Sequence, residues 1–164
     1  MAPPAGIMSA DANARGAARM AAVQALYQME LAGTGAEEVA EEFIAHRFAE
    51  FSDNPDTEFF SAIVTGVPGY QVEIDRAIAA CLSENWTMTR MDSILRAVLR
   101  AAGFELIARR DVPAKVVIDE YVGLARAFFP GDEPGFVNAA LDTMARRKRA
   151  KEFGLPTPEG EADF

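Results

Sequence analysis

The chain of 164 residues is poor in the residues that make disulfides and metal sites, because it contains one cysteine, Cys81, and one histidine, His46. A disulfide within the chain needs a second cysteine, and a structural zinc site needs about four Cys or His ligands, so the composition excludes both. It also excludes the cysteine pair of a thiol–disulfide redox enzyme. Such low cysteine usage is typical of a reducing compartment, and we expect a cytoplasmic protein.

Long apolar runs and catalytic motifs are also missing. No apolar stretch approaches the ~20 residues that a membrane-spanning helix requires, so we expect no membrane association. The sequence has no Gly-rich phosphate loop followed by Lys and Ser or Thr, and no nucleophile elbow accompanies His46. We therefore expect a protein that is not an enzyme, with no catalytic residue, no metal site and no cofactor.

The net charge of −9 opposes the binding of nucleic acid by bulk charge, but it is unevenly distributed along the chain. Residues 36–75 hold ten acidic residues and a single basic residue, whereas residues 76–151 hold thirteen basic and nine acidic residues. A protein with local faces of opposite sign can bind a nucleic acid on one of them. The alternative is that the charges only solvate helix surfaces.

Apolar residues recur at spacings of three and four nearly throughout, which predicts helices over residues 12–32, 36–50, 56–66, 70–82, 91–109, 114–128 and 134–151. Asp11 is the predicted cap of the first helix and Gly33 its end, and Asp132 is the predicted cap of the last. The segment Gly66-Val67-Pro68-Gly69 has the composition of a turn between two helices. No β-type alternation is present, so the predicted fold class is all-α with about seven helices.

The same pattern predicts a simple domain organisation. Residues 12–151 are expected to form a single helical domain. Residues 1–11 are rich in Pro, Ala and Gly and are predicted to be a disordered lead. Residues 152–164 combine Gly, Pro and acidic residues and are predicted to be a flexible acidic tail.

Basic residues combined with aromatic ones are the remaining candidates for a function. Two pairs of arginines are spaced four apart and thus share a helix face, namely Arg15 with Arg19 and Arg96 with Arg100, and the densest basic run covers residues 146–151. Together with the rings of Tyr27 and Phe136 they permit a surface for single-stranded RNA, on which rings stack with bases and guanidinium groups hold phosphates. The alternative for both rings is packing in the core.

Four sequence blocks occur in the order found in one known family. They are Arg15-Gly-Ala-Ala-Arg19-Met-Ala-Ala-Val-Gln-Ala-Leu-Tyr27, Asn85-Trp86 with Arg96-Ala-Val-Leu-Arg100, Asp111-Val-Pro-Ala-Lys115-Val-Val-Ile-Asp119-Glu120, and Phe136-Val-Asn138-Ala-Ala-Leu-Asp142. These blocks resemble the NusB family of bacterial transcription antitermination factors, and the resemblance covers residues 14–146.

The resemblance implies two packed three-helix bundles plus an extra helix, and no catalysis. It implies that the protein binds the boxA element of nascent ribosomal RNA leaders together with NusE, a small-subunit ribosomal protein. This pair joins an antitermination complex with RNA polymerase and supports rRNA synthesis and maturation. A monomer and a homodimer are both compatible with the resemblance.

Site residues follow from the same resemblance. Arg15, Arg19 and Tyr27 match an arginine-rich RNA-binding motif, in which Gly16 and Ala17 replace arginines of some members. Phe136 matches an aromatic RNA-binding position. The partner-binding positions are Asp132, Arg96 and Arg100, although the two arginines match positions where bracing of the bundle is an equal alternative.

Two other interpretations stay open at this point. Some rRNA cytosine methyltransferases carry a NusB-like domain, and this chain would then be such a domain without the catalytic one. A purely structural helical partner with no RNA role is the other alternative.

Overall fold

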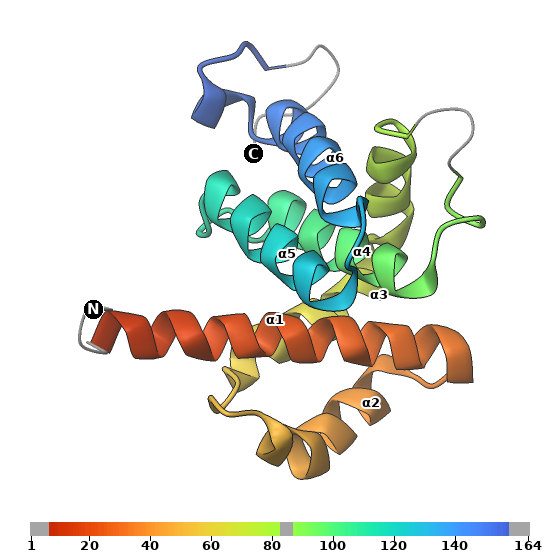
Figure 1. Ribbon diagram of the computed structural model, residues 1–164, viewed down its shortest axis with the longest axis vertical. Coiled ribbons are helices and arrows are strands. Elements are labelled where there is room, and N and C mark those ends of the chain that lie inside the picture. The colour runs from red at the N-terminus through yellow and green to blue at the C-terminus, as the bar shows by residue number, and fades with distance from the viewer. Residues whose placement is uncertain (1–6, 83–86, 158–164) are drawn as a thin grey trace. The chain divides into compact units, whose positions relative to one another are not determined.

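The computed structural model describes residues 7–82 and 87–157, and every regular element in these ranges is helical (Figure 1). The described part contains α1 (Ile7–Ala32), α2 (Ala36–Glu42), α3 (Thr57–Ala79), α4 (Ser93–Ala108), α5 (Ala114–Phe128) and α6 (Glu133–Lys148). Three short turns of helix accompany them, the π-helical η1 (Phe43–Arg47) and the 3₁₀ turns η2 (Phe48–Glu50) and η3 (Ala150–Phe153). The predicted all-α fold class is confirmed. In the same ranges, no helix is long and apolar enough to cross a membrane.

The first helix ends as predicted but begins earlier. Gly33 has a positive φ of 68°, and its N–H donates to the Met29 carbonyl at 2.9 Å, which is how a glycine closes a helix. Because α1 starts at Ile7, Asp11 lies inside the helix and the prediction that it caps the start is wrong. Residues 1–6 of the predicted disordered lead lie outside the described residues, as does the predicted loop at Asn85-Trp86.

The predicted turn at Gly66-Val67-Pro68-Gly69 is wrong, because α3 runs through it with Pro68 inside the helix. A proline within a helix removes one hydrogen bond and costs about 3 kcal/mol. The helical spacing of buried residues nevertheless continues from Ile63 and Val67 to Ile74, whereas Pro68 and Gly69 are exposed. Burial of this apolar stripe therefore overrides the local preference for a turn.

Two helical glycines make a matched pair for a stability test. A Cβ at Gly69 would meet no atom within 4 Å, whereas a Cβ at Gly103 in α4 would lie 2.9 Å from the Ile74 Cγ2 atom. We expect Gly69→Ala to raise the free energy of unfolding by about 0.5–1 kcal/mol, because alanine restricts the unfolded chain. We expect Gly103→Ala to lower it by about 1–3 kcal/mol, because the β-branched Ile74 cannot move aside freely. Urea unfolding of both variants checks this, and effects of the same sign would contradict it.

The chain divides into two compact units, Met1–Gly69 and Tyr70–Phe164. In the first unit, α1 buries the small side chains of Ala18, Ala21, Ala22 and Ala25, which lets neighbouring elements approach its backbone closely. The ring of Phe60 stacks on Phe43 at 5.7 Å and meets Phe48 edge-on at 4.9 Å between centroids. Asp56 precedes α3 and caps it, because its Oδ1 accepts from the Phe59 N–H at 2.9 Å.

In the second unit, α4, α5 and α6 all pack against one another. Residues 101–106 of α4 are buried on every side, which makes α4 the central helix of this unit. Within this core the Glu105 carboxylate accepts a hydrogen bond from the Tyr121 hydroxyl, so a fully buried acid is matched by a buried donor.

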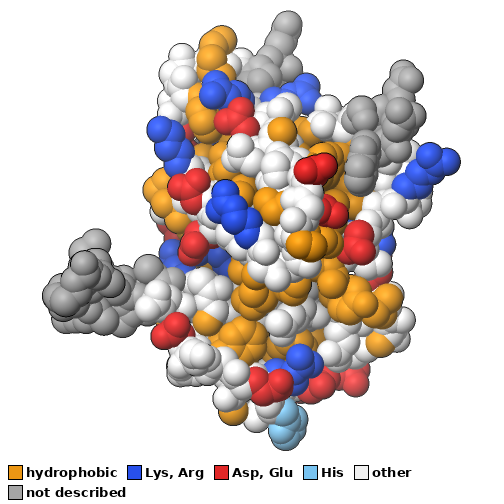
Figure 2. Space-filling view, in the orientation of Figure 1, with side chains coloured by type: hydrophobic (Ala, Val, Ile, Leu, Met, Phe, Trp, Pro, Cys, Tyr) orange, Lys and Arg blue, Asp and Glu red, His pale blue; other side chains and the backbone are white. Residues whose placement is uncertain are grey.

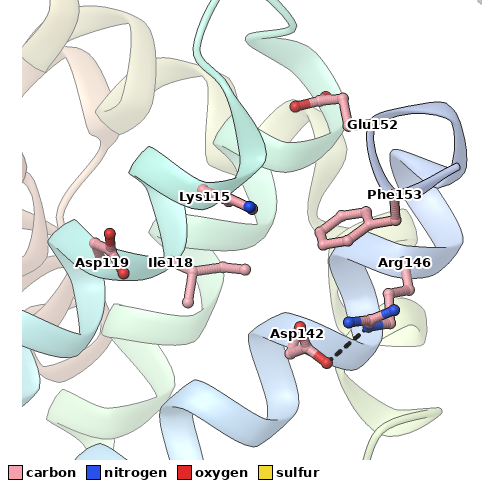
Figure 3. Close-up of a pocket in the computed structure, with 7 residues that line it drawn as sticks. All are labelled: Lys115, Ile118, Asp119, Asp142, Arg146, Glu152 and Phe153. Carbon is pink, nitrogen blue, oxygen red and sulfur yellow. Dashed lines mark hydrogen bonds and ion pairs between the residues drawn. The ribbon is translucent and has the colours of Figure 1, made fainter.

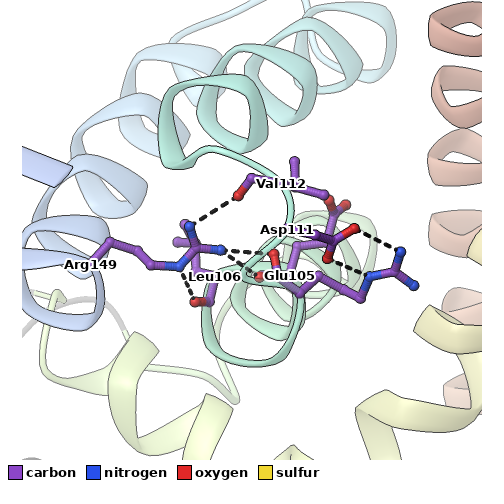
Figure 4. A network of polar contacts seen from close by, with 6 residues as sticks. Glu105, Leu106, Asp111, Val112 and Arg149 are labelled. Atoms are coloured by element: carbon purple, nitrogen blue, oxygen red, sulfur yellow. Dashed lines mark hydrogen bonds and ion pairs between the residues drawn. The ribbon is translucent and has the colours of Figure 1, made fainter. Parts of the chain in front are cut away.

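Arg149 belongs to the basic run that the sequence suggests as a charged surface, but its side chain is only 1 % exposed. Its guanidinium group donates to the carbonyls of Leu106 (2.7 Å), Arg109 (2.9 Å), Val112 (3.0 Å) and Glu105 (3.1 Å), as Figure 4 shows in part. Several of these carbonyls belong to the last turn of α4, where a helix has no partners of its own and favours a cation. Arg149 thus completes the C-terminus of α4.

Glu152 accepts a hydrogen bond at the other kind of helix end, the N-terminus of α5. Pro113 stands at the cap position and provides no side-chain bond, and the Ala114 N–H donates instead to the Glu152 carboxylate at 2.9 Å. Glu152 also accepts from Arg149. We call Arg149 and Glu152 the α4–α5 clamp. Glu152 and Phe153 lie in η3, so the structure gives these first residues of the predicted flexible tail defined positions, while residues 158–164 lie outside the described ranges.

The clamp makes stability depend on pH. Desolvation alone raises the pKa of Glu152, but the Ala114 N–H and the Arg149 guanidinium lower it, and the net pKa lies below its ordinary value of 4.5. A carboxylate with a depressed pKa stabilises the fold above its unfolded-state pKa, and this contribution disappears as the pH falls through the folded-state pKa. We expect wild type to be more stable than Glu152→Gln near neutral pH, with a difference that narrows below pH 4.5. Urea unfolding at several pH values measures this, and a constant difference would contradict it.

Candidate nucleic-acid interface

The first unit brings Arg15 and Arg19 of α1 onto one aromatic ring. The guanidinium carbon of Arg15 lies 4.5 Å from the centroid of the Phe59 ring, and that of Arg19 lies 4.8 Å from it. The ring therefore holds both cations through cation–π attraction. Their exposure differs, since Arg19 is only 2 % exposed whereas Arg15 is half-buried. Of this pair, Arg15 is the side chain that reaches solvent and can meet a phosphate.

Tyr27 lies three turns further along the same helix and is half-buried. A half-buried tyrosine keeps part of its ring in contact with solvent, and a partly exposed ring is what base stacking requires. Part of the Tyr27 side chain is thus packed in the core, and the rest is accessible for stacking with a base.

In the second unit, Asp132 and Phe136 lie at the start of α6. Asp132 stands at the N-cap position and is exposed, but its side chain makes no capping bond. The predicted position of the cap is thus confirmed, whereas its bond is absent. Phe136 is half-buried one turn into the helix. An acidic and an aromatic side chain are thus both accessible to a partner at this end of α6.

Arg96 and Arg100 of α4 are engaged inside the second unit. Arg96 donates to the carbonyls of Met88 and Met91, which fixes the turn that leads into α4. Arg100 forms a bidentate ion pair with Asp75 of α3, with both N···O distances at 2.9 Å. These contacts match the alternative in which the two arginines brace the bundle. As partner-binding positions both residues stay predictions.

No continuous basic patch marks the visible surface, because Lys/Arg and Asp/Glu side chains are interspersed over the face shown in Figure 2. Exposed pairs such as Arg146 with Asp142 (2.9 Å) and Arg47 with Glu50 (3.0 Å) neutralise each other locally. Among the described residues, no three Cys, His, Asp or Glu side chains gather as a metal site would require. On this face, a nucleic acid would rely on a few cationic side chains.

For two groups of residues, nothing in the sequence indicates the contacts that they make in the structure. Phe59 reads as an ordinary core position of α3, and nothing in its spacing shows that two arginines of α1 lie on its ring. Arg149 and Glu152 read as members of a basic run and an acidic tail. Only the tertiary structure shows that they complete the ends of α4 and α5.

Comparison with known proteins gives one consistent result. The model of the NusB family matches residues 16–146. The chain is 50% identical to the transcription antitermination protein NusB of Maricaulis maris over 147 residues, which cover 87% of this chain and 92% of the relative. It is 52% identical to the protein of the same name from Bartonella tribocorum over 144 residues, 85% of this chain and 92% of the relative.

Solved structures agree in fold. T. maritima NusB superposes with a TM-score of 0.72 at 29% sequence identity, covering 86% of this chain and 97% of that one. A chain from the crystal structure of antitermination factors NusB and NusE in complex with dsRNA superposes with a TM-score of 0.71 at 23% identity, covering 82% and 97%. On the family match and the identity to these relatives, the chain belongs to the NusB family.

Proposed function

We propose that this protein is a non-catalytic transcription antitermination factor, which binds the boxA element of nascent rRNA leader transcripts together with NusE. The observation that carries the proposal is the 50% identity to an antitermination protein over 92% of that protein's length. The complex would act on RNA polymerase in the cytoplasm and support transcription and maturation of rRNA.

The RNA contacts of this proposal are Arg15, Tyr27 and Phe136. Arg15 offers a guanidinium group that is held in place by Phe59 and reaches solvent, which suits a phosphate. Tyr27 and Phe136 offer partly exposed rings for base stacking. Arg19 supports the arrangement from inside, because it shares the Phe59 ring but is buried.

The partner contacts of this proposal are centred on Asp132. Its carboxylate is exposed at the start of α6, so a basic protein could pair with the acid. A net charge of −9 opposes strong RNA binding by this chain alone. We therefore propose that most of the phosphate neutralisation in the complex comes from NusE.

A transcription assay tests the function itself. RNA polymerase transcribes a template with a boxA-containing leader and a terminator downstream, with NusE and the other factors present and this protein either added or omitted. The proposal predicts that read-through rises when the protein is added and falls back when boxA is scrambled. Unchanged read-through would contradict it and would favour a structural role without RNA.

A further inference from the structure

A pocket of about 490 Å³ lies between α5, α6 and η3 in the second unit (Figure 3). Lys115, Ile118 and Asp119 line it from α5, Arg146 lines it from α6, and Phe153 lines it from η3. Its volume falls in the range of sites that bind small molecules. Phe153 lies beyond residues 16–146 of the family match, so a part of this chain outside that match completes the pocket.

Some of the charges in this pocket are already used. Asp142 pairs with the Nε atom of Arg146 at 2.9 Å, and Glu152 is bound to the Ala114 N–H and to Arg149. Lys115 and Asp119 differ from them, because neither makes a hydrogen bond or ion pair with any described residue. The pocket thus presents an ammonium group and a carboxylate, one helical turn apart, that are both available to a ligand.

The pocket also has an apolar floor. Figure 3 shows the Lys115 ammonium group and the Phe153 ring pointing toward one another, with the Ile118 side chain directed at the same space. The guanidinium carbon of Arg146 lies 4.9 Å from the centroid of the Phe153 ring, which holds this second cation beside the floor. Two cations, three carboxylates and a partly aromatic floor therefore surround one cavity, and of the three carboxylates only Asp119 makes no hydrogen bond or ion pair with a described residue.

We propose that this pocket binds a single ribonucleotide. Its phosphate would lie between Lys115 and Arg146, its base against Phe153 and Ile118, and its ribose hydroxyls would donate to Asp119. A simple anion would use the two cations but offer no donor to Asp119, and a simple cation would offer no acceptor to Lys115. A ribonucleotide supplies a partner to both, because its hydroxyls are donors and its phosphate is an acceptor.

This inference goes beyond the proposed function. Arg146 lies ten residues, or about 15 Å, along α6 from Phe136, so the pocket is separate from the RNA contact proposed at Phe136. The same chemistry is offered by a free ribonucleotide and by one unit of an RNA strand. The pocket can be tested without NusE and without boxA, so its failure would leave the antitermination proposal untouched.

The test titrates the full-length protein with the four ribonucleoside monophosphates and with their 2′-deoxy counterparts, observed by calorimetry or by NMR. We expect the ribonucleotides to bind more tightly than the deoxyribonucleotides. Lys115→Ala should weaken ribonucleotide binding about tenfold, because it removes one charge-assisted contact. Asp119→Asn should reduce the preference for ribose. Arg126→Ala removes an exposed cation from the same helix but outside the pocket, and it should change nothing.

A short oligoribonucleotide that lacks boxA identifies the source of the ligand. Tighter binding of the strand than of the monophosphate, with the same loss in Lys115→Ala, would indicate a unit of RNA, and the opposite order would indicate a free ribonucleotide. The proposal is overturned if neither form binds at millimolar concentration. It is also overturned if Lys115→Ala and Arg126→Ala have equal effects, or if Asp119→Asn leaves the preference for ribose unchanged.

Discussion

Replacing Arg149 by alanine should lower the free energy of unfolding by about 3–5 kcal/mol, the largest effect that we expect from any single substitution in this chain. The side chain is 1 % exposed and donates to four backbone carbonyls as well as to Glu152. Without the guanidinium group, buried carbonyls at the end of α4 lose their donor, and each unsatisfied group costs about 1–3 kcal/mol. Urea unfolding followed by circular dichroism measures the loss.

The neighbouring Arg147 is the matched control, because it belongs to the same basic run but is exposed. Arg147→Ala should change the free energy of unfolding by less than about 0.5 kcal/mol. Arg149→Lys should recover little of the loss, since a lysine ammonium cannot reproduce the fork that reaches carbonyls in several directions. Equal, small effects at both positions would show that the α4–α5 clamp does not hold the helix ends.

Substitutions of Arg15 and Arg19 should have different effects, the first on RNA binding and the second on stability. Arg15→Gln should weaken binding of boxA RNA and reduce the slope of log affinity against log salt concentration by about 0.7, because one phosphate contact to a single strand is lost. Arg19→Gln should leave that slope unchanged but lower the free energy of unfolding by about 1–2 kcal/mol, because it removes a desolvated cation from the Phe59 ring.

The readouts are fluorescence anisotropy of labelled RNA at several salt concentrations and urea unfolding of each variant. Phe59→Leu serves as a further control, since it removes the ring beneath both cations but keeps an apolar side chain in the core. If the salt slope falls by the same amount in Arg15→Gln and Arg19→Gln, the burial of Arg19 does not keep it from RNA. If it falls in neither, Arg15 is an ordinary surface charge.

Regular helices with clear ends could be predicted from the sequence. The helix expected over residues 114–128 is found as Ala114–Phe128, because its apolar residues keep a strict helical spacing and Pro113 precedes it. The glycine at position 33 closes α1 as expected. Both features depend on residues that are close together in the sequence, so short stretches of sequence are enough to predict them.

The predictions are wrong or silent where the local structure depends on residues that are distant in the sequence. Gly66-Val67-Pro68-Gly69 has the composition of a turn, yet the burial of Val67 keeps it helical. The spacing of Ile63, Val67 and Ile74 was the available signal, and it is in helical phase across the proline. Arg149 offered no signal, because its partners at Glu105–Val112 lie about forty residues away in the sequence.

In the candidate site, too, the residues could be predicted from the sequence, but their burial could not. The resemblance indicated Arg15, Arg19, Tyr27, Asp132 and Phe136, but it could not show that Arg19 is buried while Arg15 reaches solvent. Four-residue spacing places two side chains on one helix face, and the packing of that face then sets the exposure of each. The ring of Phe59, on which both guanidinium groups lie, belongs to another helix, and the four-residue spacing does not indicate it.

Binding of boxA RNA with and without NusE shows whether this protein and NusE recognise the RNA jointly. Labelled boxA RNA is titrated with this protein alone, with NusE alone and with an equimolar mixture, and a scrambled RNA of the same length serves as control. We expect the mixture to bind boxA more tightly than either protein alone, and scrambling to remove most of the gain. If the mixture binds no more tightly than the better of the two proteins, the account of a joint RNA-binding antitermination factor is contradicted.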